Sequence, residues 1–300
     1  MKDTFIQEFS RLAASPDRDL ATPALMIARL ECPLLDPGPS LKQLDAMGAA
    51  ASARLMASGC LQDARRPENA LDVLNAYLFD EEGFTGNHDR YDDPSNSFLN
   101  EVIERRRGIP ITLAVVYMEV ARRAGMHVEG VNFPGHFLMR YPSHLNEGVR
   151  QGPQGMLADV ILDPFHRGAR LSEHDCRRLL ERHVGDEAAF DPSLLAPATK
   201  SQMLTRMLLN LKRIYVRLHS FPQARNVTEL LLAVDPPAIT ELRDRGLLAY
   251  HMNDFSAALR DLQQYLHFSA GSPVDEEGRS DHEQLWEHVK TLRRRVASLN

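Results

Sequence analysis

Two residues with catalytic potential, His136 and Asp163, are placed where neighbouring predicted strands could bring them together. His136 follows Pro134 and Gly135, and Asp163 closes a short run rich in β-formers beside Pro164. An aspartate that accepts a hydrogen bond from one imidazole nitrogen fixes the tautomer of the ring. The other nitrogen is then left to act as a base toward a nucleophile. The sequence therefore predicts a His–Asp pair and leaves its nucleophile open.

No side chain in this region is an obvious nucleophile for that pair. Thr112 carries a hydroxyl near the start of a predicted helix and is the candidate surrogate. Cys60 and Cys176 are remote from that helix in the sequence. The three cysteines, Cys32 included, form no CxxC pair and are odd in number, which argues against a disulfide framework. We expect them to be buried apolar residues.

The same region also raises the question of a metal ion. A zinc site could draw on His127, His136, His144, Asp163 and His166, but these residues follow no HExxH or comparable spacing. We therefore expect no metal and no cofactor. The His–Asp pair also has two interpretations without catalysis. It could brace two strands with satisfied hydrogen bonds, or line a pocket that binds a small molecule or a peptide end without turnover.

The elements that must position these residues begin with helices. Apolar periodicity predicts helices over roughly the first eighty residues, and the polar segment 80–97 predicts a surface loop. The apolar run 111–125 predicts a central helix. Pro110 suits its first turn, and Gly125 suits a left-handed cap at its end.

Strand signals follow this helix. Runs rich in β-formers at 128–133, 136–141 and 157–162 predict a small antiparallel sheet. Because helices precede strands without regular βαβ alternation, the order indicates an α+β fold. We expect this domain, including the N-terminal helices, to occupy residues 1–192.

Only helix signals remain after residue 192, and they repeat. Apolar positions recur at an offset of 34 residues, the tetratricopeptide (TPR) period: Leu208 and Leu242, Phe221 and Phe255, Ala224 and Ala258. An apolar stripe suited to a capping helix follows at Leu285, Val289, Leu292 and Val296. We expect residues 193–300 to form an all-α TPR-like tail, with a plain helical bundle as the alternative.

Three strings carry a resemblance to a known family: NSFLNEVIERRRGIPITLAVVYMEVARRAG, PGHF and LDPF. With the tail repeats, they resemble the transglutaminase-like superfamily, and more closely a bacterial SirB-type family that joins such a core to TPR repeats. A related core occurs in some eukaryotic F-box proteins. The resemblance covers roughly residues 70–268, and it implies a papain-like core.

The resemblance also implies a role for single residues. Active members of the superfamily place a cysteine in a Gly-x-Cys turn at the start of the central helix, followed by a histidine and an aspartate on adjacent strands. The histidine falls on His136 and the aspartate on Asp163, but the cysteine position falls on Pro110. Proline has no side-chain donor, acceptor or nucleophile. The departure indicates a residual triad without its nucleophile.

Charge narrows the range of partners. The net charge of −6 argues against general nucleic-acid binding, and no apolar stretch is long enough to span a membrane. With no signal peptide evident, we expect a cytoplasmic protein.

The predicted tail nevertheless carries a local set of basic residues. This set could bind an acidic peptide or a terminal carboxylate, or it could form a solvated helix face. Its members are Lys212, Arg213, Arg217 and Arg225.

These observations predict a non-catalytic transglutaminase-like protein that acts as an interaction or regulatory module through its TPR tail. The alternative is a hydrolase or acyl-transfer enzyme that uses His136 and Asp163 with an unidentified nucleophile. The identity of the partner does not follow from the residues.

Overall fold

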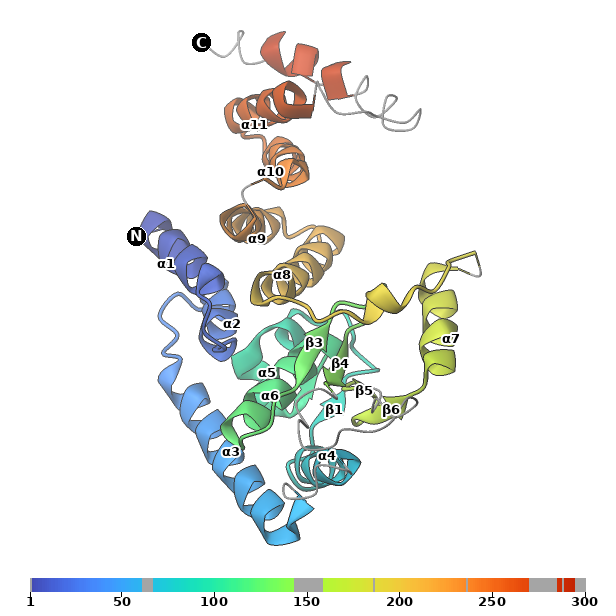
Figure 1. Ribbon diagram of the computed structural model, residues 1–300. Helices are drawn as coiled ribbons and strands as arrows, with labels where there is room; N and C mark the ends of the chain where they lie inside the picture. Colours follow the sequence, from blue (N-terminus) through green and yellow to red (C-terminus); the bar gives the residue numbers. More distant parts are fainter. Residues whose placement is uncertain are drawn as a thin grey trace. The chain divides into compact units, whose positions relative to one another are not determined.

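The computed structural model describes residues 2–60, 67–142, 159–185, 187–235, 237–269, 285–287 and 289–294 (Figure 1). The chain divides into two compact units. One runs from Pro16 to Met207, and the other joins the residues up to Ser15 with those from Leu208 onward. This division follows contacts and does not test which segments fold independently. The domain boundary that the sequence predicts after residue 192 therefore stays a prediction.

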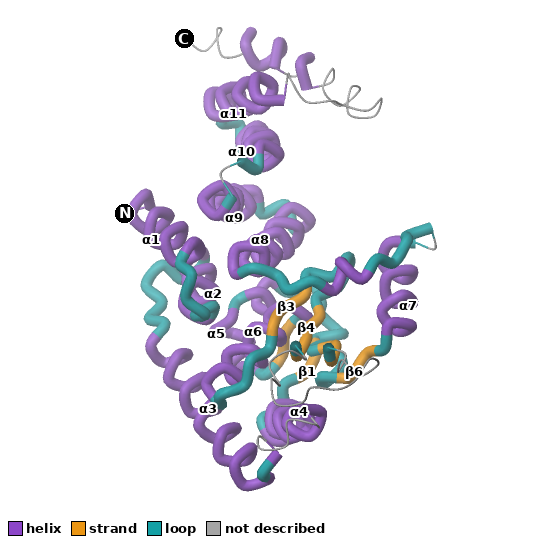
Figure 2. Tube along the Cα trace, viewed as in Figure 1, coloured by secondary structure: helices purple, strands orange, loops and turns teal. Residues whose placement is uncertain are grey.

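The first unit is a core of helices around a small sheet (Figure 2). Its α-helices are α2 (Ala21–Ile27), α3 (Gly38–Ser58), α4 (Pro67–Asn75), α5 (Leu99–Arg105), α6 (Pro110–Arg123) and α7 (Glu173–Val184). Its strands are β1 (Thr85–Gly86), β2 (Arg107–Gly108), β3 (Glu129–Val131), β4 (Leu138–Tyr141), β5 (Val160–Asp163) and β6 (Ala169–Leu171). The predicted α+β class is confirmed.

Helix α6 is the centre of this unit. Every residue from Pro110 to Ala121 is buried, as expected of a helix that is apolar all round. Pro110 is its first residue, and Gly125 follows its end with φ of 86°, as the sequence predicts. Helix α3 packs against α6, and Gly48 allows the close approach, because a Cβ there would lie 2.3 Å from Cβ of Arg123.

The polar segment 80–97, which precedes α5, is partly buried. Asn87 and Asn96 are 4% and 0% exposed, and Nδ2 of Asn87 donates to Oδ1 of Asn96 at 2.9 Å. The prediction of a solvated loop over 80–97 is therefore wrong at these residues. Their amides bond each other, which makes burial tolerable.

The predicted antiparallel sheet is confirmed, with strand order β3-β4-β5-β6. Val131 pairs with Leu138 and Arg140 with Ile161, so all three expected strands are present. Strand β6 and the parallel pair of β1 and β2 were not predicted. Each is two or three residues long, too short to show an alternating pattern.

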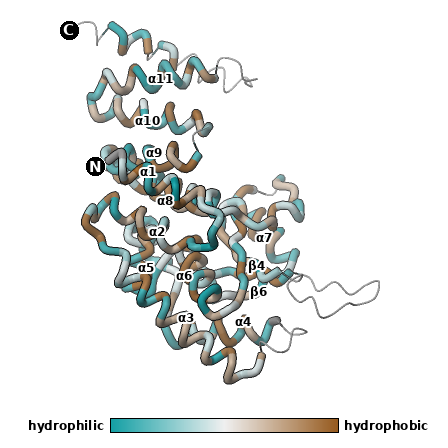
Figure 3. The backbone as a smooth tube through the Cα atoms, turned by 60° about the vertical axis from the view of Figure 1, so that its left-hand side comes forward, coloured by the Kyte–Doolittle hydropathy of each residue, from teal (hydrophilic) through white to brown (hydrophobic). Residues whose placement is uncertain are grey.

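The second unit contains the repeat helices. They are α9 (Phe221–Val234), α10 (Ile239–His251) and α11 (Phe255–Ser269), preceded by α8 (Lys200–Arg217), which runs across the boundary between the units. Hydrophobic and hydrophilic residues alternate along α10 and α11 (Figure 3). Ala224 and Ala258, which occupy equivalent repeat positions, are both 0% exposed. The predicted TPR-like tail is confirmed.

Two further segments pack on these repeats. Leu285, Val289 and Leu292 join an apolar cluster with Ala258 and Leu262, as the predicted capping stripe requires; Val296 lies outside the described residues. At the other end, α1 (Lys2–Ala14) packs against α9, and the hydroxyl of Ser10 donates to the carbonyl of Ala233 at 2.9 Å. From the sequence, we expect this N-terminal helix to belong to the domain formed by residues 1–192.

Candidate functional site

His136 lies in a tight turn immediately before β4. Its backbone N–H donates to the carbonyl of Phe133 at 3.1 Å, and Gly135 adopts the left-handed φ of 70° that the turn requires. The side chain of His136 is buried, at 6% exposure for the residue. The turn therefore fixes where the imidazole points.

Asp163 is the last residue of β5, and both of its carboxylate oxygens are bonded. Nε2 of His136 lies 3.0 Å from Oδ1, and Nδ1 of His166 lies 2.8 Å from Oδ2. The backbone N–H of Phe165 also donates to Oδ1 at 2.9 Å. Burial alone would raise the pKa of Asp163, but its bonds to His136 and His166 hold that pKa below its ordinary value.

The predicted His–Asp pair is thus brought together in space. Nε2 of His136 faces the carboxylate, so Nδ1 is the nitrogen that could act on a neighbouring group. His166 was considered only as a zinc ligand in the sequence, yet it shares the same aspartate. It sits in the turn between β5 and β6, where local spacing makes it a neighbour of Asp163.

Two more histidines surround the pair. The ring of His183, on α7, stacks on that of His136 with centroids 5.7 Å apart and planes 14° apart. Burial and the adjacent His136 lower the pKa of His183. His88 packs on Phe165 with ring centroids 4.4 Å apart. Sequence reasoning missed both, because only the tertiary fold brings them here.

The position of the expected nucleophile is occupied by proline. Pro110 opens α6, and Thr112 lies two residues further along, in the first turn of the helix. The hydroxyl of Thr112 accepts a hydrogen bond from the backbone N–H of Ile109 at 3.1 Å and lies 2.8 Å from the carbonyl of Asn96. Thr112 is also 0% exposed. Its hydroxyl therefore serves the backbone at the start of the helix.

The cysteines are spread through the core and the surface. Cys176 lies in an apolar cluster with Phe133 and Leu180, and burial raises the pKa of its thiol to about 11. A thiol in that state is a poor nucleophile near neutral pH. Cys60 is also buried, but Cys32 is exposed, so the expectation that all three are buried is wrong for Cys32.

Comparison with known protein families decides the identity of the core. A profile of the transglutaminase-like superfamily matches residues 39–209, more than half of the chain. The chain belongs to the transglutaminase-like superfamily. A tetratricopeptide repeat profile matches residues 211–285.

The relatives of this transglutaminase-like protein include bacterial and eukaryotic chains. A UPF0162 protein of Xylella fastidiosa (strain Temecula1) is 41% identical over 197 residues, covering 65% of this chain and 66% of the relative. A UPF0162 protein of Pseudomonas aeruginosa is 34% identical over 196 residues, covering 64% and 63%. Human F-box only protein 21 is 29% identical over 202 residues, covering 65% of this chain and 30% of the relative.

The chain spans 66% of the length of the Xylella relative, 63% of the Pseudomonas relative and 30% of the human relative, which is less than two thirds in each case. No solved structure matches it. The family-level resemblance is confirmed, including the union of a transglutaminase-like core with TPR repeats.

The TPR repeats of this transglutaminase-like protein hold much of the predicted basic set in ion pairs. Nζ of Lys212 lies 2.8 Å from carboxylate oxygens of both Glu241 and Asp244, and Arg225 pairs with Asp254 at 3.0 Å. The first two pairs join α8 to α10, and the third joins α9 to the residue that precedes α11. Arg213 and Arg217 both lie exposed on α8.

Within the part of the chain that the structure describes, no helix is long and apolar enough to cross a membrane.

Proposed function

We propose that this protein is a cytoplasmic, regulatory protein-interaction module in which the transglutaminase-like core performs no acyl transfer. The observation that carries the proposal is Pro110, the first residue of α6. A helix N-terminus lowers the pKa of a thiol and favours its reactive anion, which is why this position suits a nucleophilic cysteine. Proline offers the helix a favourable φ but no reactive atom.

The neighbouring side chains support the same conclusion. Thr112 bonds the backbone through its hydroxyl, and Cys176 is held as a buried thiol. With no nucleophile to activate, the 3.0 Å contact between His136 and Asp163 serves to brace β4 against β5, or to shape a pocket that binds without turnover.

The TPR tail supplies the interaction surface in this proposal. TPR repeats stack helix pairs into extended surfaces that bind other chains. An acidic peptide partner would reach Arg213 and Arg217, because both side chains lie exposed on α8. Guanidinium groups suit carboxylates because they pair with them through two parallel hydrogen bonds.

A charge-reversal experiment tests this surface. The full chain, tagged and cross-linked in its native cell, is captured as wild type, as the double variant Arg213→Glu and Arg217→Glu, and as Arg260→Glu. Arg260 is 69% exposed on α11 and serves as the matched control. We expect a stoichiometric protein partner that the wild type and the control capture and the double variant does not. Equal capture by all three chains would remove the acidic-peptide proposal.

A second function is favoured by one observation. The buried His136–Asp163 contact has the geometry of a working base and its orienting carboxylate. A hydrolase or acyl-transfer enzyme with an unidentified nucleophile would need that contact for turnover. Loss of any measured activity on changing His136 to alanine would establish this alternative.

A further inference from the structure

The turn between β5 and β6 brings a third potential metal ligand to the His–Asp pair. One ligand-capable atom from each of His136, Asp163 and His166 lies within 4.8 Å of the other two. Among the residues that the structure describes, this is the one such group of three. All three residues are among the five conceivable zinc ligands of the sequence, which predicts no metal because they come from two separate turns with no zinc-type spacing.

We propose that His136, Asp163 and His166 form a binding site for a divalent transition-metal ion of the zinc class. Two imidazole nitrogens and one carboxylate oxygen are the ligand set of many open zinc sites, in which solvent or a bound group takes the fourth position. Hard ions such as Ca²⁺ and Mg²⁺ prefer oxygen ligands, so two imidazoles select against them.

The spacing of the ligand atoms suits such an ion. Ligands about 2.0–2.1 Å from a tetrahedral zinc ion lie roughly 3.3 Å from one another. Here Nε2 of His136 lies 3.0 Å from Oδ1 of Asp163 and Nδ1 of His166 lies 2.8 Å from Oδ2, and one ligand atom from each of the three residues lies within 4.8 Å of the other two. Small side-chain movements would open these contacts to admit the ion.

The carboxylate is also held in place from outside the site. The backbone N–H of Phe165 donates to Oδ1 of Asp163 at 2.9 Å, and the N–H of Gly168 donates to its backbone carbonyl at 2.8 Å. Such outer contacts orient a ligating carboxylate before the metal arrives. They also fix the turn that carries His166.

Burial divides the site into a closed and an open side. The side chains of His136 and Asp163 are 7% and 4% exposed, whereas that of His166 is 53% exposed. A metal ion can therefore enter past His166, and it would find two preorganised ligands behind it. This proposal concerns the core and goes beyond the proposed binding function of the tail.

Zinc titration of the metal-free full chain tests the site, with Co²⁺ as a spectroscopic probe. His166→Ala removes the exposed ligand, and His127→Ala is the matched control, because His127 is a partly exposed histidine paired with Glu129. We expect one Zn²⁺ per wild-type chain, unchanged affinity in His127→Ala and at least about tenfold weaker binding in His166→Ala, since even outer-shell changes weaken metal sites by this much.

The Co²⁺ form should show the visible absorption of a tetrahedral ion in the wild type and lose it in His166→Ala. Circular dichroism verifies that the variant is folded, and His166→Gln replaces it if it is not. Absence of stoichiometric zinc binding by the wild type would overturn the proposal. So would equal binding by the wild type and the folded His166 variant, since the ion would then be held elsewhere.

Discussion

Gly135 determines how closely α7 approaches the turn that carries His136. Its φ is 70°, and a Cβ at this position would lie 2.3 Å from Cβ of His183. We predict that Gly135→Ala destabilises the protein by more than the roughly 1–2 kcal/mol that left-handed strain alone costs. Chemical denaturation measures the difference.

Gly125 separates strain from collision in this experiment. It has a φ of 86°, but a Cβ there would meet nothing within 4 Å. Gly125→Ala should therefore show the strain alone. Equal losses of stability in the two variants would contradict the close approach of His183 to the turn.

Asp254 should make the tail sensitive to acid. The backbone N–H of Ala257 and the side chain of Arg225 both bond its carboxylate, and these contacts lower its pKa, with the backbone bond the largest cause. The ionised form is then favoured in the folded state. It stabilises the tail above the ordinary aspartate pKa, and this contribution is lost as the pH falls through the lowered value.

The variant Asp254→Asn tests this sign. It keeps an oxygen for the Ala257 N–H but loses the charge. Amide hydrogen exchange in α11 should show the wild type more stable than the variant at neutral pH. The gap should close as the pH falls below the aspartate range. A gap that stays constant or widens in acid would be inconsistent with the lowered pKa.

The site itself was only partly predictable at this scale. His136 and Asp163 could be paired from the sequence because each stands at the end of a recognisable strand. His88 and His183 could not, since His183 comes from α7 and His88 from a loop, and no periodicity links either to the pair. The exposure of Cys32 could not be predicted either, because free cysteines are buried on average and nothing in the local sequence marks this one as an exception.

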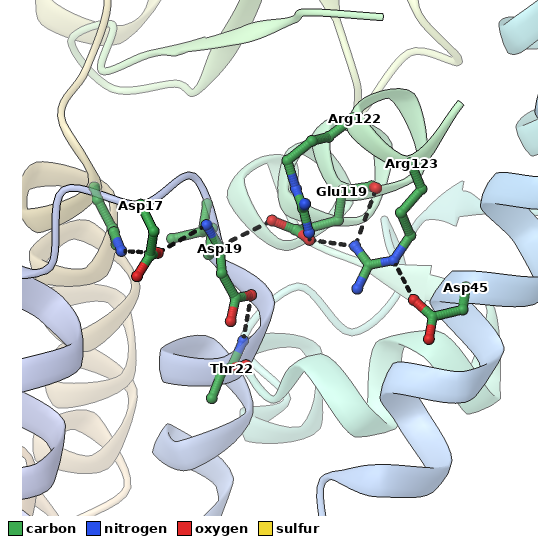
Figure 4. Close-up of polar contacts among 9 residues, drawn as sticks. Asp17, Asp19, Thr22, Asp45, Glu119, Arg122 and Arg123 are labelled. Atoms are coloured by element: carbon green, nitrogen blue, oxygen red, sulfur yellow. Dashed lines mark hydrogen bonds and ion pairs between the residues drawn. The ribbon is translucent and has the colours of Figure 1, made fainter. Parts of the chain in front are cut away.

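At the scale of elements, Glu119 ties the start of α2 to α6 (Figure 4). It is 2% exposed, accepts the backbone N–H of Leu20 at 3.0 Å, and pairs with Arg122 and Arg123. Arg123 continues the link to Asp45 on α3 at 2.7 Å. The three helices are therefore joined through one buried carboxylate.

Removing that carboxylate should be costly. Glu119→Ala leaves the Leu20 N–H without its acceptor and removes the buried carboxylate that pairs with Arg123. Breaking a buried pair costs about 3–5 kcal/mol. Asp45 is 67% exposed, so Asp45→Ala should cost no more than about 1 kcal/mol. Urea denaturation of both variants measures the contrast, and similar losses would refute a special role for Glu119.

Helix α1 should stabilise the tail repeats. Phe9 is 0% exposed, and α1 packs on α9. Phe9→Ala is expected to destabilise this unit by about 3–5 kcal/mol, as large-to-small core changes do. Gln7→Ala, at an exposed position of the same helix, is the control. Hydrogen exchange in α9 should rise in the first variant alone; unchanged exchange would contradict the packing of α1 on α9.

Long elements were predictable and long-range pairings were not. Helix α6 and the 34-residue repeat follow from local apolar patterns, and both were found. The grouping of α1 with the tail depends on contacts between residues more than 200 positions apart, such as Ser10 with Ala233. No local pattern encodes such a contact.

The whole molecule joins a transglutaminase-like core to TPR repeats, and we propose that the repeats supply the binding surface. The central claim of this proposal is that Pro110 leaves His136 and Asp163 without a nucleophile. Metal binding at the site would be compatible with this claim, because it depends on His166 and not on α6. The claim is therefore tested by measuring whether the protein catalyses acyl transfer.

The most direct measurement compares acyl-transfer and peptide-hydrolysis rates of the full wild-type chain with those of its His136→Ala variant, on a panel of glutamine-containing peptides. We predict rates at the uncatalysed background for both proteins. A wild-type rate above background that His136→Ala abolishes would contradict it, and would show that the pair still serves a nucleophile.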